Sequence, residues 1–392
     1  MYALKNEIRP YPWGSTTAIP EMLGVPATGE PQAEMWIGAH PASPSVLLDG
    51  TARPLTEVIA ADPGHELGSV ITERFGARLP FLLKLLAAAE PLSLQAHPNP
   101  AQAVAGYQLE DEAGIPLDSP GRNYKDPYAK PEMICALTPI EAVVGFRPLA
   151  EALADARSLG VADALRPYLE AADGQGDVRA AFAALLELEI SERTRLISTV
   201  LAAAEESRLP IARLLRHLGS RYSTDAGVLA VLLMNHLELP AGAAVLLPSG
   251  NLHAYVSGVG VELLANSDNV LRGGLTGKHI DIPELLSVVD FSPESPVVIS
   301  EDPESVEQVF PTPAEEFRLT RIRLRPDTSV RLEPYGGQLL LCTEGTVDLH
   351  ATDPTVASHP LRLSPGHSAW VSAADGAITL SGEGTAFRAH VG

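Results

Sequence analysis

Four residues with metal-binding side chains lie in strand-like segments that are far apart in the chain. Gln95 and His97 are separated by one residue, so a β-strand would place both side chains on one face. Glu132 begins a second apolar stretch, and His253 follows the apolar run 243–247. Two imidazoles, a carboxylate and an amide oxygen leave room for solvent, which suits catalytic zinc better than a thiolate-rich structural site.

A metal-free interpretation is the alternative. A single histidine on an apolar strand is usually a core or surface residue, and a Gln-x-His pair is weak evidence by itself. Against this, Glu132 lies in a Lys-Pro-Glu sequence, and a dense polar stretch in Gly-rich sequence follows His253. Residue types and spacing alone leave both interpretations open.

The polar stretch 262–278 is a second candidate for chemistry. Most charged runs are solvated loops, but one that follows a candidate ligand favours a binding site. A nucleotide-binding loop is excluded. Gly258-Val259-Gly260 lacks the third glycine of the dinucleotide motif, and His279 occupies the place where a phosphate loop needs Ser or Thr.

The composition is that of a soluble globular protein with two or three domains. The chain has 392 residues, of which 45% are hydrophobic and 20% charged. A formal net charge of −21 argues against a nucleic-acid partner and against an anionic membrane surface, but not against a small anionic substrate. Cys135 and Cys342 are the only cysteines and suggest no disulfide framework, which favours the cytoplasm. No signal peptide and no apolar stretch of roughly 20 residues is found, so no membrane association is expected.

The order of predicted elements is β, then α, then β. Short apolar runs between Pro- and Gly-rich turns predict strands at 45–48, 81–86 and 141–146, with short helices at 55–60 and 101–107. Apolar spacing near 3.6 predicts helices at 178–189, 192–206 and 227–239, the second capped by Ser191. From residue 311 the sequence is nearly all strand and turn, and the alternation in 317–324 slips at Thr320, which predicts a β-bulge.

The candidate ligands lie on both sides of the helical segment. If they meet at one metal, the helices are an insertion within the catalytic β-domain. The expected division is 1–149 and 241–310 for the catalytic domain, 150–240 for the helical insertion, and 311–392 for a C-terminal β-domain.

These segments resemble the type I mannose-6-phosphate isomerase family, which are zinc-dependent enzymes of the cupin fold. The resemblance runs in the family's order and spacing through 11–14, 33–41, 91–99, 130–132, 253–255 and 267–272. It implies two cupin-like jelly-roll β-domains with an all-α domain, one zinc per chain, and a monomer. The implied reaction interconverts mannose 6-phosphate and fructose 6-phosphate.

The resemblance also implies roles for individual residues. Zinc would be bound by Gln95, His97, Glu132 and His253, and catalysis would use Arg272, Glu262 and Lys130. The sugar pocket would be lined by Trp13, Glu34, Tyr255, Asp268 and Lys278, with Lys84 and Ser93 where the phosphate is expected. One departure is Tyr128-Ala129, which replaces the family's usual Asn-His.

The implied chemistry moves a proton between C2 and C1 through an enediol. It needs a base near the proton and a cation or donor near each oxygen. Glu262 is the first candidate for the base, and a zinc-bound water or Lys130 are the alternatives; Lys130 would need burial or a cationic neighbour to lose its proton. The same isomerisation of another sugar or sugar phosphate, or a cupin-type sugar-binding protein without turnover, is the alternative function.

Overall fold

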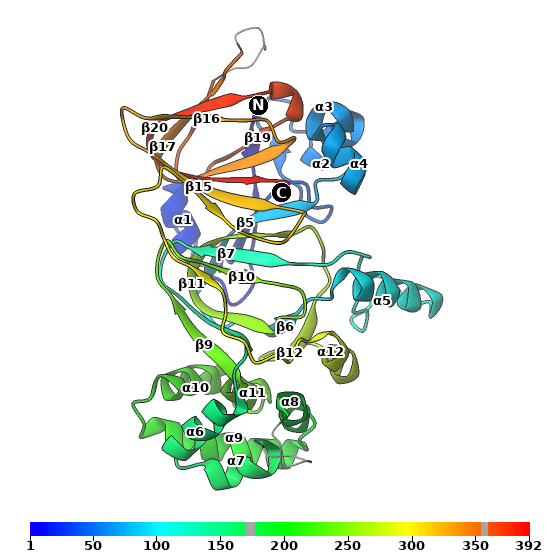
Figure 1. Cartoon of the computed structure of the whole chain (residues 1–392), viewed down its shortest axis with the longest axis vertical. Coiled ribbons are helices and arrows are strands. Elements are labelled where there is room, and N and C mark those ends of the chain that lie inside the picture. The colour runs from blue at the N-terminus through cyan, green and yellow to red at the C-terminus, as the bar shows by residue number, and fades with distance from the viewer. Residues whose placement is uncertain (170–176, 354–359) are drawn as a thin grey trace.

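The structure is a computed structural model that describes residues 1–169, 177–353 and 360–392. Within these residues the strands form one sheet of 11 strands and one of nine, and the chain is mostly β with helices. Figure 1 shows three tiers: the nine-stranded sheet with both termini at one end, the 11-stranded sheet in the middle, and a bundle of helices at the other end. No helix in the described part is both long and apolar enough to cross a membrane.

The 11-stranded sheet is organised around its longest strand. Its members are β2 (Glu7–Arg9), β3 (Glu34–Ile37), β5 (Phe81–Ala88), β6 (Leu94–Ala96), β7 (Glu132–Ala136), β8 (Ile140–Phe146), β9 (Met234–Leu239), β10 (Ala244–Leu247), β11 (His253–Ala265), β12 (Leu271–Gly274) and β13 (Val298–Ile299). The first part of β11 pairs with β6 and β8, and its second part pairs with β5 and β7. Between these parts Gly258 has a φ of 118°, and a Cβ there would lie 2.6 Å from the Pro139 carbonyl oxygen. Glycine therefore lets β11 change partners and curve the sheet.

The nine-stranded sheet combines both ends of the chain. Its members are β1 (Tyr2–Lys5), β4 (Val46–Leu47), β14 (Glu307–Phe310), β15 (Arg318–Leu324), β16 (Ser329–Leu332), β17 (Gln338–Ala351), β18 (Leu361–Leu363), β19 (Ser368–Val371) and β20 (Ile378–His390). The N-terminal β1 lies between β19 and β4. One apolar cluster joins the two sheets, with Leu83 and Val261 from one and Leu319 and Trp370 from the other.

The bulge predicted in 317–324 is wrong. β15 pairs with β14 and β20 in continuous register. Leu319 packs in the cluster between the two sheets, whereas Ile322 and Leu324 pack in a second cluster on the opposite face. The strand is buried on both faces, and this explains why its apolar residues do not keep to one face.

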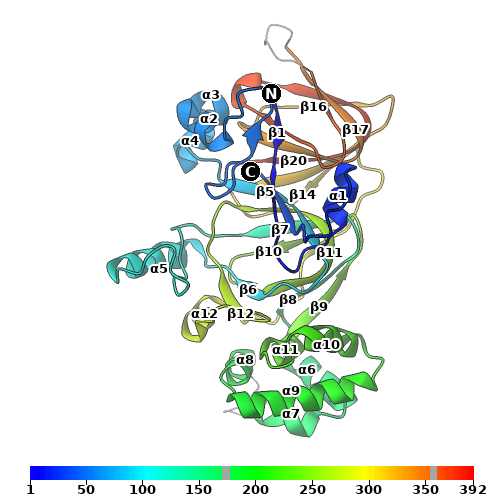
Figure 2. The same cartoon turned by 180° about the vertical axis from the view of Figure 1, so that it is seen from behind.

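The helices frame the sheets. They are α1 (Ala18–Leu23), α2 (Leu55–Ala61), α3 (Pro63–Leu67), α4 (Ser69–Phe75), α5 (Pro100–Glu112), α6 (Leu149–Ser158), α7 (Ala162–Leu169), α8 (Val178–Leu186), α9 (Ile190–Glu205), α10 (Pro210–Arg221), α11 (Gly227–Ala230) and α12 (Ile282–Val288), with 3₁₀ turns η1 (Val231–Leu233) and η2 (Ala373–Asp375). Figure 2 shows α2, α3 and α4 beside the nine-stranded sheet. Asn99 starts α5 with a capping box completed by Gln102, and Pro100 occupies the first helical position.

The helical predictions are confirmed in part. Helices α2, α5, α8 and α9 overlap the predicted segments, but α9 begins at Ile190, so the predicted cap by Ser191 is wrong. The predicted helix 227–239 is also wrong in its second half, because the chain becomes β9 at Met234. Pairing of β9 with β8 supplies the hydrogen bonds that a continued helix would have made internally.

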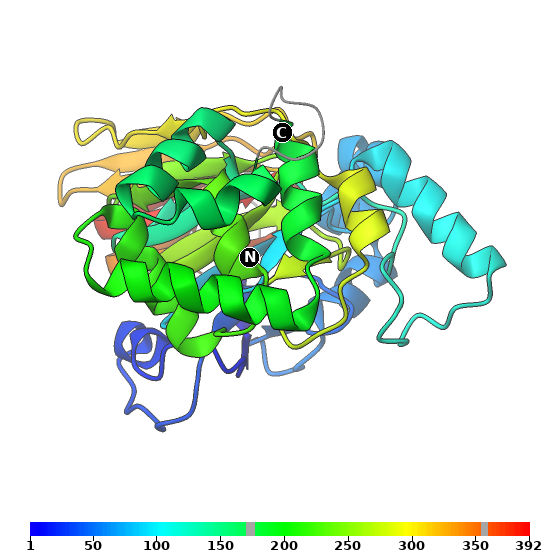
Figure 3. The ribbon, with the colours of Figure 1, turned by 90° about the horizontal axis from the view of Figure 1, so that it is seen from below.

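Helices α6–α11 cover one outer face of the 11-stranded sheet, as the view from below shows (Figure 3). Leu94, Ala96, Ala254 and Leu271 belong to the same apolar cluster as these helices. Alternation along each strand turns the intervening side chains to the other face. The helical bundle therefore fixes the strands β6, β11 and β12 from behind, and their polar residues face a cavity in front.

Candidate active site

Three of the four predicted metal ligands meet at one point. The Nε2 atom of His97 lies 3.4 Å from Glu132 Oε1, and Nε2 of His253 lies 3.1 Å from Glu132 Oε2. All three residues are buried. Gln95 lines the adjoining cavity and is the direct partner of His253 where β6 pairs with β11. Segments separated by the whole helical region are thus brought together.

The polar atoms at this point are left without partners. Nε2 of His97, Nε2 of His253 and Oε2 of Glu132 are buried and make no hydrogen bond to any described residue. Unsatisfied buried polar atoms are rare in folded proteins and call for an unseen partner. Three convergent N and O donors are the set that a zinc ion uses in a catalytic site, so these residues fit the metal.

Backbone carbonyls fix the orientation of both imidazoles. Nδ1–H of His97 donates to the Asn269 carbonyl oxygen at 2.7 Å, and Nδ1–H of His253 donates to that of Asn251 at 3.1 Å. With the proton held on Nδ1, the lone pair of each Nε2 points toward Glu132. Burial lowers the pKa of His97 to about 4, which keeps this imidazole neutral.

The lysine next to Glu132 supplies a counter-charge. Lys130 Nζ lies 3.2 Å from Glu132 Oε1, and both side chains are buried. Burial opposes the ionisation of Glu132, but its pKa lies well below the ordinary value, and the positive charge of Lys130 acts in that direction. The carboxylate is therefore available as an anionic ligand.

A second group of charges forms one wall of the cavity. Glu262 and Lys84 are paired residues on β11 and β5, and Lys84 Nζ lies 3.3 Å from Glu262 and 3.4 Å from Glu34. Burial raises the pKa of Glu262 above its ordinary value, and the carboxylates of Glu132 and Glu34 act in the same direction. Burial by itself would lower the pKa of Lys84, but Glu34 and Glu262 raise it above the ordinary value.

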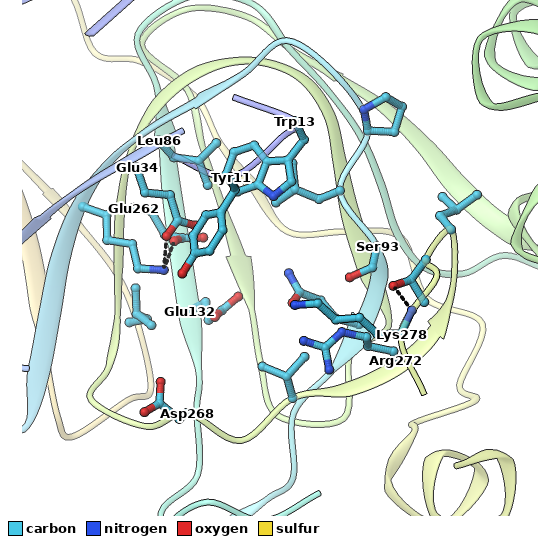
Figure 4. Close-up of a pocket in the computed structure, with 18 of the residues that line it drawn as sticks. Tyr11, Trp13, Glu34, Leu86, Ser93, Glu132, Glu262, Asp268, Arg272 and Lys278 are labelled. Carbon is cyan, nitrogen blue, oxygen red and sulfur yellow. Dashed lines mark hydrogen bonds and ion pairs between the residues drawn. The ribbon is translucent and has the colours of Figure 1, made fainter. Parts of the chain in front are cut away.

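The opposite side of the cavity is cationic. Figure 4 shows Ser93, Arg272 and Lys278 close together, across the cavity from Glu34 and Glu262. Arg272 is held in place by β12, where it pairs with Gln95 of β6. Burial lowers the pKa of Arg272 and of Lys278, and Arg272 lowers that of Lys278 further. Lys84, which we expected beside Ser93 at the substrate phosphate, contacts the carboxylates of the other side instead.

The cavity between these groups has a volume of about 440 Å³. Of the predicted site residues, those with side chains in its lining are Trp13, Glu34, Lys84, Ser93, Gln95, Lys130, Glu132, Glu262, Asp268, Arg272 and Lys278. Tyr255 is fully buried against His253, with ring centroids 6.0 Å apart, and its hydroxyl lacks a hydrogen-bond partner among the described residues. Burial raises the pKa of Tyr255 well above its ordinary value, so it stays a neutral donor.

Several residues of the site were missed in the sequence. His40 accepts a hydrogen bond at Nδ1 from the Ala42 amide, and its Nε2 lies 3.3 Å from Asp268 Oδ1. Asp126 and Asn269 join two loops of the site. The loop of Asp126 leads to Glu132, and the loop of Asn269 supplies the carbonyl oxygen that binds His97. The side-chain Nδ2 of Asn269 donates to the backbone carbonyl oxygen of Asp126 at 2.7 Å. Asn269 lies in the segment 267–272, which the family resemblance had singled out, and Asp126 lies just before Tyr128-Ala129, but no spacing rule indicates that the two residues bond each other.

The departure from the family's usual sequence lies outside the cavity. The Tyr128 ring stacks under the Arg78 guanidinium at 3.6 Å, and neither Tyr128 nor Ala129 lines the cavity. The backbone at this point is still held, because the Tyr128 carbonyl oxygen accepts from Asn269 Nδ2 at 2.9 Å. This backbone hydrogen bond does not depend on the side chains at 128 and 129, so Tyr128-Ala129 is compatible with the observed positions of Lys130 and Glu132.

The chain is similar over its whole length to known proteins. Residues 1–149 match the family model for the catalytic domain of phosphomannose isomerase type I. The mannose-6-phosphate isomerase of Escherichia coli strain K12 is 36% identical over 100% of this chain and 99% of its own length, and the human enzyme is 29% identical over 95% of this chain and 93% of its own length.

Solved structures of the same kind superpose on the whole chain. A mannose 6-phosphate isomerase crystallised with zinc and yttrium has a TM-score of 0.91 and 35% identity, and covers 100% of this chain and 99% of its own. The Salmonella typhimurium enzyme bound to fructose 6-phosphate and zinc gives the same values. This chain belongs to the type I mannose-6-phosphate isomerase family.

Proposed function

We propose that this protein is a zinc-dependent aldose–ketose isomerase that interconverts mannose 6-phosphate and fructose 6-phosphate. The observation that carries the proposal is the buried cluster of His97, Glu132 and His253, whose converging atoms lack hydrogen-bond partners and whose Glu132 lines a cavity with a carboxylate wall and a cationic wall. Full-length similarity to mannose-6-phosphate isomerases supports it.

Zinc would be held by Gln95, His97, Glu132 and His253. When bound, it supplies a Lewis acid that orients and polarises the substrate's oxygens. The four residues come from β6, from β7 and from the start of β11, with His97 just beyond the end of β6, so ordered strands fix the donor atoms before the metal arrives.

Glu262 is our first candidate for the base that carries the proton between C2 and C1. Its raised pKa suits a carboxylate that must accept a proton near neutral pH and release it again. Lys84 holds the Glu262 side chain at 3.3 Å and so fixes its orientation. Lys130 is the second candidate, because its side chain is buried in the lining of the same cavity, 3.2 Å from Glu132.

The cationic wall holds the rest of the substrate in this proposal. Lys278 and the Ser93 hydroxyl bind the phosphate, and Arg272 stabilises the negative charge of the enediolate. Lys84 is already neutralised by two carboxylates, so we assign it to the acid–base wall rather than to the phosphate. Both walls line the same cavity of about 440 Å³, so one substrate can contact both.

Chelation tests the function. The purified protein should interconvert mannose 6-phosphate and fructose 6-phosphate, lose this activity after dialysis against a chelator, and regain it with about one equivalent of zinc. Activity that persists in protein shown by elemental analysis to be free of metal would contradict the proposal. Binding of the sugar phosphates without turnover would favour a sugar-binding protein instead, and turnover of a different sugar phosphate would favour the other alternative.

The phosphate should be needed for turnover as well as for affinity. Binding energy from a remote group holds the reacting carbons in place, so kcat/KM for free mannose should be at least about a hundredfold lower than for its phosphate. Lys278→Ala should raise KM for the phosphorylated sugar about tenfold. Lys5→Ala, which removes an exposed cation on β1, is the matched control and should change neither KM nor kcat/KM for the phosphorylated sugar. Equal turnover of mannose and its phosphate would refute this assignment.

We also propose the arrangement in which the enzyme works. The two sheets correspond to two cupin-like domains, the catalytic one interrupted by the insertion expected at 150–240. Its helical part ends at Leu233, because β9 (Met234–Leu239) pairs with β8 and belongs to the sheet. The protein acts as a cytoplasmic monomer, which analytical ultracentrifugation and fractionation can test.

A further inference from the structure

The turn between α10 and α11 reaches from the helical bundle to the cavity. Asp225 lies in this turn, and its carboxylate accepts three backbone hydrogen bonds. Oδ1 accepts from Gly227 N at 2.7 Å and from Leu275 N at 2.8 Å, and Oδ2 accepts from Thr276 N at 3.1 Å. One side chain of the insertion thus binds the loop that leads from β12 to Lys278.

The two backbones are in direct contact at this place. A Cβ on Gly274 would lie 2.7 Å from Gly227 Cα, and one on Gly227 would lie 2.7 Å from Leu275 N. Leu275 has a φ of 54°, a conformation that L-residues with side chains rarely adopt, and Asp225 binds its amide. The loop is therefore held in an unfavoured conformation from outside, by the helical bundle.

The hydrogen bonds that begin at Asp225 continue through Thr276 to Lys278. Thr276 receives the Asp225 contact at its amide, and its own hydroxyl accepts from the Lys278 amide at 3.1 Å. The same turn also contacts the segment before Ser93, because the Tyr222 hydroxyl donates to the Pro91 carbonyl oxygen at 3.3 Å and Arg221 lies 3.8 Å from Glu90. Arg221 and Tyr222 line the cavity themselves.

We propose that Asp225 is a positioning residue for the reaction, which acts by holding the loop 275–278 so that the Lys278 ammonium faces the substrate phosphate. This inference rests on the proposed function, which places the phosphate at that wall. The helical insertion then has a direct part in substrate binding, in addition to its packing on the sheet.

The proposal predicts a larger effect on KM than on kcat. Arg272 is fixed by pairing between β12 and β6, which does not involve Asp225. Lys278 lies beyond the end of β12, and its loop depends on the contacts of Leu275 and Thr276. Loss of the Asp225 contacts should therefore displace Lys278 and leave Arg272 in place.

Asp225→Asn is the test variant, because it keeps the size of the side chain but replaces one acceptor oxygen by a donor. In steady-state kinetics with fructose 6-phosphate we expect KM to rise about three- to tenfold, kcat to change by less than about twofold, and zinc content to be unchanged. Inhibition by inorganic phosphate should weaken by a similar factor. Asp177→Asn is the matched control, since Asp177 also lies in the helical bundle and accepts from a backbone amide, that of Arg179, but is away from the cavity.

A double-mutant cycle decides whether Asp225 acts through Lys278. In a Lys278→Ala background, Asp225→Asn should have little further effect on KM. Additive effects, an unchanged KM with lowered kcat, or the same result from Asp177→Asn would overturn the proposal. A wild-type protein that fails to isomerise hexose phosphates would contradict the proposed function. Calorimetric titration of wild type and Asp225→Asn with inorganic phosphate would then test Asp225 alone, and equal affinities would refute its role.

Discussion

Glu132→Ala is expected to remove the metal and to lower turnover by on the order of a thousandfold or more, while the sheets stay folded. Glu132 is the one anion of the ligand set and lies within 3.4 Å of both imidazoles. The fold does not depend on the metal in the way a small zinc domain does, because the strand that carries Glu132 is anchored by Met133 and Cys135 in the cluster between the two sheets. His253→Ala should behave in the same way.

Three measurements check this expectation: zinc per chain by elemental analysis, turnover, and far-ultraviolet circular dichroism with a thermal melt. His236→Ala is the matched control, because His236 also contacts a glutamate, Glu141, at 2.8 Å. Arg213 forms ion pairs with Glu141 and with Glu238, so these carboxylates are already neutralised without a metal. The control should therefore keep one zinc and full turnover. Should Glu132→Ala or His253→Ala keep both zinc and turnover, that residue is not a ligand.

The elements that could be predicted from the sequence are those determined by the pattern of neighbouring residues. Strands such as β5 and β8 follow from apolar runs bounded by turn residues, and α8 and α9 follow from helical spacing. The errors arise where long-range pairing decides. Met234–Leu239 has helical composition but lies against β8, and β15 departs from alternation because both of its faces are buried. Neither the pairing of β9 with β8 nor the burial of β15 on both faces can be inferred from the local sequence.

The same distinction holds for the site. Gln95 and His97 could be paired from alternation, Glu132 and His253 were candidates from residue type and context, and the resemblance implied that all four bind one zinc. Sequence spacing could not show that Lys84 is held by two carboxylates, since that depends on the register of β5 against β11 and β3. It also could not show Asp225, whose carboxylate binds amides about 50 residues later in the chain. Every residue except proline has a backbone N–H group that can donate to Asp225. These hydrogen bonds therefore require no particular residue type at 275 and 276, and no sequence motif indicates them.

Arg272→Ala is expected to lower kcat by on the order of a hundredfold or more, with a modest change in KM and with zinc retained. The alternative is a surface arginine paired with one of the many acids, and such pairs contribute little. The structure argues against that alternative, because burial lowers the pKa of Arg272 and no carboxylate of a described residue forms an ion pair with it. The side chain faces the cavity beside Ser93 and Lys278 (Figure 4).

A cation held without an anionic partner is available to stabilise charge that appears only during the reaction. If Arg272 meets the enediolate, its contribution is realised in the transition state, so kcat falls while ground-state binding through Lys278 persists. Arg272→Lys should restore little, because an ammonium cannot reproduce the planar fork of a guanidinium. Arg362→Ala, which breaks an exposed pair with Asp348 on the nine-stranded sheet, is the control and should leave kcat unchanged. Wild-type kcat in Arg272→Ala, or a loss explained by missing zinc, would assign Arg272 a structural role.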